Sequence, residues 1–211
     1  MMHDRPDFRQ LIRGQLIRGW QRLIAALCCV LLSSAVVAHA EQTFMTIKGD
    51  TRSTAWWVLA DFHPFTTEVR GMPVDQIRKG WCKATEFRKD LIPKEYLFQG
   101  GADAMEASNR SFALEGNFDG STTRQVALVG VYEECKGTKG SFVMILDLPT
   151  SGKPRIRLLE AMRTEHQFSA LSLGEDKTIS VWSCMDCDDF ANLKWNSKRK
   201  RFVWLPRPAA D

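Results

Sequence analysis

The chain has 211 residues, of which 29 are Lys or Arg and 25 are Asp or Glu, so its formal net charge is +4 at pH 7. The first 40 residues hold five of the basic and two of the acidic residues, which leaves 24 basic and 23 acidic residues in the remainder. A segment so close to neutrality has no global electrostatic field that could hold nucleic acid or an anionic membrane. We therefore expect no nucleic-acid partner.

Residues 1–40 have the composition of a cleavable signal peptide. Five arginines precede an apolar run from Leu23 to Ala38, and Ala38-His39-Ala40 offers a peptidase site. The run is shorter than the roughly 20 residues that a membrane-spanning helix requires, so we expect membrane contact only during export. The Arg-rich start favours a bacterial, periplasmic or secreted location. A retained signal anchor is an alternative, as is lipid attachment at Cys28, although Leu27 stands where a lipobox has a small residue.

Residues 41–211 are expected to form a single exported domain, because 171 residues without a low-complexity linker suffice to bury one core. The pattern over 41–105 is mixed. It predicts a strand over Ala55–Phe62 and then one amphipathic helix of about five turns, which begins near Pro73, ends at Pro93 and is weakest at Gly80. The positions with helical spacing are Ile77, Trp81, Ala84, Arg88 and Leu91.

Within residues 106–211 the period of the apolar pattern changes to two, which is typical of β-strands. Eight short strands are predicted, so the fold class is mainly β (α+β), an antiparallel meander that carries the one helix. A sandwich, a curled sheet or propeller-like blades all fit this pattern. We expect Trp195 and Trp204 on one face of the last hairpin and the basic run 198–201 at its solvated tip. The strands are expected at 112–118, 126–132, 142–146, 155–158, 168–173, 179–184, 191–195 and 202–205.

The turn Gly116–Gly120, with the sequence Gly-Asn-Phe-Asp-Gly, is followed by the apolar run Gln125–Gly130. Over about residues 111–133 the chain resembles a blade of the integrin-like FG-GAP propeller repeat. In that family such a turn often binds calcium and precedes an apolar strand, so the resemblance implies a β-meander. Ser121 and Thr122 stand where the calcium loop would continue with another Asp and Gly.

Four cysteines follow the leader, and an even number of cysteines in an exported chain predicts two disulfides. Three pairings exist. We favour Cys82 with Cys135, which would tie the predicted helix to the sheet, and Cys184 with Cys187. The first pairing encloses roughly 50 residues and would stabilise the fold by about 3 to 4 kcal/mol, whereas the second would contribute little global stability.

The motif Cys184-Met185-Asp186-Cys187 leaves three roles open, of which a structural disulfide is favoured. A thiol–disulfide oxidoreductase is the alternative function, although its first cysteine would need a following helix to lower the thiol pKa, and none is predicted. The neighbouring carboxylates of Asp186, Asp188 and Asp189 would raise that pKa. These aspartates are weak candidates for a calcium site, and the four thiols for zinc. We expect neither a metal nor another cofactor.

Two histidines follow the leader, His63 and His166. The sequence contains no H-E-x-x-H, G-x-S-x-G or phosphate-binding glycine motif, so a hydrolase built on either histidine remains only an alternative.

An aromatic group near the start of the domain has two interpretations, a buried core or an exposed binding surface. The candidate surface residues are Trp56, Trp57, Phe62, His63 and Phe65. We expect a non-enzymatic exported protein that binds or inhibits a protein or envelope ligand.

Overall fold

The computed structural model describes residues 43–99, 102–164 and 166–206, so the predicted signal peptide lies outside the described residues. Strands account for 43% of the described residues and helices for 12%, which confirms the mainly β fold class. All eight strands expected after residue 106 are present. They belong to two antiparallel sheets.

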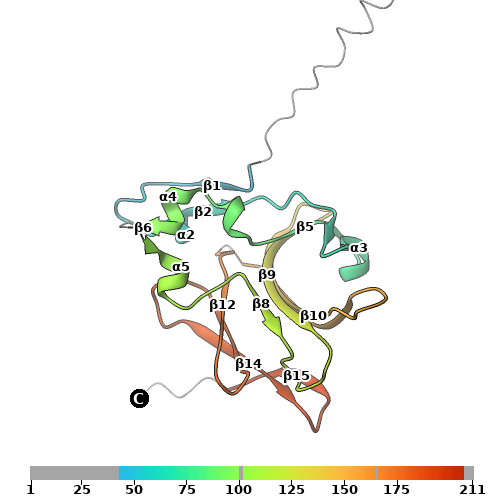
Figure 1. Cartoon of the computed structure of the whole chain (residues 1–211). Helices are drawn as coiled ribbons and strands as arrows, with labels where there is room; N and C mark the ends of the chain where they lie inside the picture. Colours follow the sequence, from blue (N-terminus) through green and yellow to red (C-terminus); the bar gives the residue numbers. More distant parts are fainter. Residues whose placement is uncertain (1–42, 100–101, 165, 207–211) are drawn as a thin grey trace, which may run out of the picture. The chain divides into compact units, whose positions relative to one another are not determined.

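The larger sheet has five strands and is organised around β9 (Gln125–Glu134). On one edge, β9 pairs with β10 (Lys139–Asp147), which in turn pairs with β11 (Arg155–Met162). Its other edge is shared by β5 (Trp81–Glu86) and β8 (Ala113–Gly116). Figure 1 shows β9 and β10 bending in an arc around the region of α3.

The smaller sheet is a four-stranded meander in sequence order. Its strands are β12 (Ala170–Leu173), β13 (Ile179–Trp182), β14 (Phe190–Asn196) and β15 (Arg201–Trp204). In the last hairpin, residues 195 and 204 lie on one face, as predicted, and the Trp195 ring contacts that of Phe202 directly opposite. The basic run 198–201 is exposed at and beside the hairpin turn, also as predicted.

Short elements fill the segment between residue 43 and β8. They are β1 (Met45–Ile47), α2 (Trp56–Leu59), β2 (Ala60–Phe62), β3 (Glu68–Val69), β4 (Met72–Pro73), α3 (Val74–Ile77), the 3-10 helix η1 (Lys89–Leu91), α4 (Lys94–Leu97), β6 (Phe98–Gln99), β7 (Ala102–Asp103) and α5 (Ala104–Ala107). The strand predicted over Ala55–Phe62 is wrong in its first part, which forms α2. Its last three residues form β2, which pairs with β1.

The predicted five-turn helix between Pro73 and Pro93 is wrong. The segment begins with a single helical turn, α3, and then becomes β5, an edge partner of β9. Gly80 separates the two with a φ of +95°, a left-handed conformation that interrupts a helix and that glycine adopts without strain. The apolar residues spaced by three to four therefore belong to three different elements, since pairing with β9 overrides local helical preference.

The five-stranded sheet is buried on both faces, which explains why β9 and β10 are apolar at nearly every position. Val129 and Ile145 join the larger core cluster together with Ile179 and Leu193 of the smaller sheet. The opposite face forms a second cluster that includes α3 and Trp81, whose ring stacks on Tyr132 at a centroid distance of 4.3 Å. The two clusters are therefore separated by the sheet itself.

Both predicted disulfides are present, Cys82–Cys135 and Cys184–Cys187. Cys82 lies at a register shift in β5, between Trp81 and Lys83, and Cys135 directly follows β9. The first disulfide therefore ties an edge strand to its central neighbour, not a helix to the sheet. Its loop of 53 residues is long enough for chain entropy to stabilise the fold by about 3 to 4 kcal/mol.

Charge pairs hold the turn Gly116–Gly120 against the five-stranded sheet. Arg157 donates to both Asp119 and Asp147, and Asp147 also accepts from Gln125 and Arg155. Burial acts to raise the pKa of Asp147, but the hydrogen bonds from Gln125, Arg155 and Arg157 outweigh it, and the pKa is lowered below 3.8. The Asp119 carboxylate likewise forms an ion pair with Arg157.

We expect acid to weaken this network. Because the Asp147 pKa is lower in the folded chain, its contribution to stability is complete above the ordinary value of 3.8 and is lost as the pH falls through the folded value. Asp147→Asn should lower the free energy of unfolding by about 2 kcal/mol at pH 7 and by less at pH 3, measured by urea unfolding. Asp90→Asn, in an exposed pair with Arg88, is the control and should change it by less than about 0.5 kcal/mol. Equal losses for the Asp147 variant at both pH values would contradict the assignment.

A residue without a side chain is required at position 130, where β9 lies between β5 and β10. A Cβ added there would lie 2.5 Å from the Thr85 carbonyl oxygen and 2.6 Å from the Phe142 ring. Gly130→Ala should therefore destabilise the protein by about 1 to 3 kcal/mol in urea unfolding. Gly174→Ala is the matched control, because the nearest atom is the flexible Asp176 carboxylate at 3.3 Å. A Gly130→Ala variant as stable as this control would show that the sheet can relax around the added methyl group.

Candidate functional site

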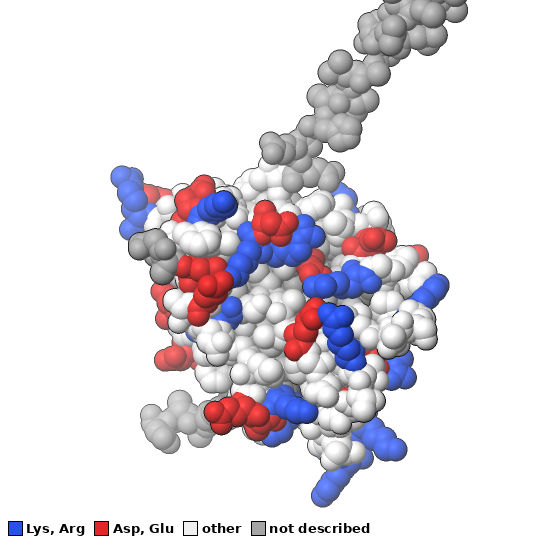
Figure 2. Space-filling model, viewed as in Figure 1, with Lys and Arg blue, Asp and Glu red and all other residues white. Residues whose placement is uncertain are grey.

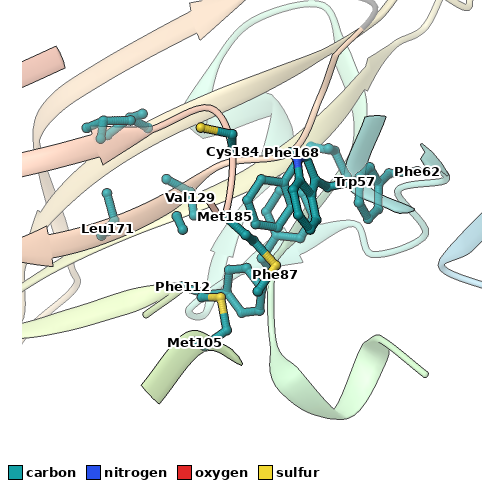
Figure 3. Packing of buried hydrophobic residues seen from close by; sticks show 14 of the residues in the cluster. Trp57, Phe62, Phe87, Met105, Phe112, Val129, Phe168, Leu171, Cys184 and Met185 are labelled. Atoms are coloured by element: carbon teal, nitrogen blue, oxygen red, sulfur yellow. The ribbon is translucent and has the colours of Figure 1, made fainter. Parts of the chain in front are cut away.

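The loop between β13 and β14 brings together the most chemically distinctive residues of the described chain. Its base is closed by a hydrogen bond from the Ser183 N–H to the Asp189 carbonyl oxygen at 3.2 Å. Within the loop, Cys184 and Cys187 form the second disulfide. Met185 is only 5% exposed and belongs to the larger core cluster. Figure 3 shows Met185 reaching from the loop toward the aromatic side chains of that cluster.

Arg110 holds this loop from a distant part of the sequence. Its guanidinium donates to the Cys184 carbonyl oxygen at 2.8 Å and to that of Cys187 at 3.4 Å. It also lies over the Trp182 ring, 3.9 Å from the centroid. The Arg110 Nε is buried and makes no hydrogen bond with the described residues. Burial lowers the Arg110 pKa, and the charges of Asp186 and Asp188 oppose that shift.

Two hollows flank the loop. The first, which we name the Arg110 hollow, is open and has a volume of about 540 Å³. It is lined by Trp57, Ala104, Ala107, Ser108, Arg110, Met185, Asp186, Cys187 and Asp188. The second, which we name the Trp204 hollow, is mostly apolar and has a volume of about 120 Å³. It is lined by Met162, Ser169, Val181, Trp182, Ser183, Asp189, Phe190, Ala191 and Trp204.

Trp182 connects the two hollows. The Arg110 guanidinium lies over the Trp182 ring. Trp182 also lines the Trp204 hollow, where its ring centroid is 4.5 Å from that of Phe190. The indole N–H donates to the Ser172 hydroxyl at 2.9 Å, which fixes the orientation of the ring. The position of the loop and the shape of the Trp204 hollow therefore depend on one side chain.

Of the two interpretations of the aromatic group near the start of the domain, the buried core is correct for Trp56, Trp57 and Phe62, and the exposed binding surface is wrong for them. Trp56 is 2% exposed, Trp57 8% and Phe62 0%, and Phe65 packs against the same cluster. The Trp56 and Trp57 rings both contact Phe168. Burial of these aromatic side chains stabilises the fold more than their exposure to solvent would. His63 and Phe65 are partly exposed, and Trp57 lines an open hollow.

His63 lies in a polar cluster but not in a hydrolytic arrangement. Lys139 Nζ is 3.1 Å from His63 Nδ1, and Thr46 Oγ1 is 3.0 Å from Nε2. Because a lysine ammonium can only donate, Nδ1 of the neutral ring accepts and the proton resides on Nε2. Nε2 then has no lone pair with which to deprotonate Thr46. The Asp61 carboxylate lies on this same side, 4.0 Å from Nε2, and not on the Nδ1 side as in a triad.

The other predicted site residues do not assemble into a chemical centre. His166 bonds through its backbone to Thr164 in an open hollow that also includes Asp61. Asp186 and Asp188 line the Arg110 hollow, whereas the Asp189 carboxylate accepts from the Ser183 hydroxyl. Over residues 43–99, 102–164 and 166–206, no group of three or more His, Cys, Asp or Glu residues is arranged to hold a metal ion.

Comparison with known proteins does not name a family. No protein-family model, curated protein or solved structure matches the chain. Among the described residues, no helix combines the length and the apolar character that are needed to cross a membrane. On the face seen in Figure 2, acidic and basic side chains are interspersed.

Sequence reasoning missed Arg110 and the Trp204 hollow. Arg110 is 74 residues from Cys184, and nothing in its local sequence indicates a buried guanidinium. Met162 lies on a strand of the other sheet, so its proximity to Trp204 follows only from the packing of β11 on β15. The period-two pattern did place Trp204 on the last strand, but it does not show which aromatic residues stay exposed.

We expect Arg110→Lys to loosen the loop although it keeps the charge. Lysine cannot reproduce the two carbonyl hydrogen bonds or the stacking on Trp182, so the free energy of unfolding should fall by about 1 to 2 kcal/mol. Hydrogen exchange of the amides in 183–189 should accelerate. Arg163→Lys, in an exposed pair with Glu134, is the control and should leave both quantities unchanged. Unchanged exchange in the Arg110 variant would show that the disulfide alone holds the loop.

Proposed function

We propose that the protein is exported to the periplasm or secreted and that it recognises a protein or envelope ligand without catalysing a reaction. The observation that carries the proposal is the pair Met162 and Trp204, two large apolar side chains that stay exposed and line the same apolar hollow. The exposed fractions are 41% for Met162 and 37% for Trp204.

These features are typical of a protein-binding surface. Trp and Met are enriched in protein interfaces, and Trp is among the residues that contribute most of the binding energy. At about 120 Å³, the Trp204 hollow is smaller than the roughly 300 to 1,000 Å³ of pockets for small molecules. It therefore suits one apolar side chain of a larger partner.

The leader and the cysteines support the exported location. An Arg-rich, apolar leader with a small-residue cleavage site directs a chain out of the cytosol. Both disulfides join cysteines of residues 43–206, and disulfides form and persist in oxidising compartments. The His63 geometry described above weighs against the hydrolase alternative.

The test compares recognition by the native and altered surface. The full chain is expressed in a Gram-negative host, recovered from the periplasm and used to capture partners from envelope extract, with contacts mapped by crosslinking and mass spectrometry. We expect a partner that crosslinks beside Trp204 and whose affinity falls at least 100-fold with Met162→Ala combined with Trp204→Ala.

The matched control is Leu173→Ala, which removes an equally exposed apolar side chain from β12 outside the Trp204 hollow. It should leave the affinity unchanged. Equal binding by the double variant and the native protein, or loss of binding with the control, would refute recognition at this surface.

A further inference from the structure

The Cys184–Cys187 disulfide differs from Cys82–Cys135 in what surrounds it. Both Cys82 and Cys135 are exposed, so exposure alone does not distinguish the two disulfides. Cys184, however, is 7% exposed, while its partner Cys187 is partly exposed and lines the Arg110 hollow. An incoming group in that hollow therefore meets only one of the two sulfur atoms.

Contacts other than the disulfide also hold this loop. Met185 is buried in the core, and the Arg110 guanidinium donates to the carbonyl oxygens of Cys184 and Cys187. At the base of the loop, the Ser183 N–H donates to the Asp189 carbonyl oxygen. Because the joined cysteines are only three positions apart in the sequence, loop closure contributes little to folding. The loop can thus keep its shape when the bond opens, and the two sulfurs stay close enough to join again.

Two groups close to Cys187 can stabilise negative charge on its sulfur. Its Sγ accepts from the Asp189 N–H at 3.4 Å, and its carbonyl oxygen is bonded by the Arg110 guanidinium. A cation and a backbone N–H both stabilise a negative sulfur. The negative charges on this hollow are Asp186 and Asp188, which face Arg110, and the lining from the α5 side is uncharged.

From these observations we infer that the Cys184–Cys187 disulfide undergoes thiol–disulfide exchange with a dithiol of a partner protein in the Arg110 hollow. A partner thiolate attacks Cys187 Sγ, a mixed disulfide forms, and Cys184 leaves as a thiolate. The second partner thiolate then attacks the partner sulfur of the mixed disulfide and releases Cys187. The partner dithiol is oxidised to a disulfide, and Cys184 and Cys187 are reduced by the same two electrons. Arg110 is a positioning residue in this exchange.

The first test uses the oxidised full chain and dithiothreitol, with each cysteine pair followed by alkylation and mass spectrometry. We expect Cys184–Cys187 to open at least tenfold faster than Cys82–Cys135, while tryptophan fluorescence reports a folded protein throughout. Equal rates, or faster opening of Cys82–Cys135, would overturn the inference.

The second test distinguishes the two sulfurs with oxidised glutathione as the probe. In Cys184→Ser, the remaining Cys187 should form a mixed disulfide at least tenfold faster than the remaining Cys184 does in Cys187→Ser. Equal rates, or faster reaction at Cys184, would refute attack at Cys187. Thermal unfolding of both variants should match the native protein, because the bond contributes little to the fold.

The third test isolates Arg110. In the Cys184→Ser background, Arg110→Met should slow the reaction of Cys187 at pH 7 at least threefold and raise the pKa of its thiol, followed by absorbance at 240 nm. Arg163→Met in the same background is the control and should change neither. An unchanged thiol pKa and rate in the Arg110 variant would contradict the assigned role. These readouts do not involve the Trp204 hollow, so they fail or succeed independently of the recognition proposal.

Discussion

Strand β9 is the constraint on which the rest of the structure depends. Both of its edges are hydrogen bonded, one to β10 and the other to β5 and β8 in succession, and its two faces belong to different core clusters. The segment that precedes β8 can therefore dock only where β9 leaves an edge free. The Cys82–Cys135 disulfide covalently fixes that same edge at the end of β9.

The candidate site is a consequence of this docking. Ser111, which lies just before β8, exchanges both backbone hydrogen bonds with Leu171 of β12. This bridge joins the two sheets and places the preceding residue, Arg110, beside the loop that follows β13. The guanidinium can then reach the Cys184 and Cys187 carbonyls and the Trp182 ring together. A side chain from one sheet thus organises a loop of the other.

The proposed recognition and the proposed thiol exchange would use two different hollows beside the same loop. The Trp204 hollow presents apolar surface to a partner, whereas the Arg110 hollow presents a sulfur atom beside a cation. Trp182 is common to both, because its ring lies under the Arg110 guanidinium and beside Phe190. The loop next to it is anchored by Met185 as well as by the disulfide.

The sequence alone determined the eight later strands and the solvated basic turn, which depend on neighbours along the chain. The even count of cysteines indicated two disulfides but left three pairings possible, of which the favoured one is present. Tertiary structure decided the rest. Residues 81–86 have helical spacing but form a strand, because β9 offers an unpaired edge. Trp56 and Trp57 are buried by Phe168, and Arg110 reaches its loop across the sheet interface. Local patterns specify which conformations a segment favours, while pairing partners and burial, which come from distant residues, select among them.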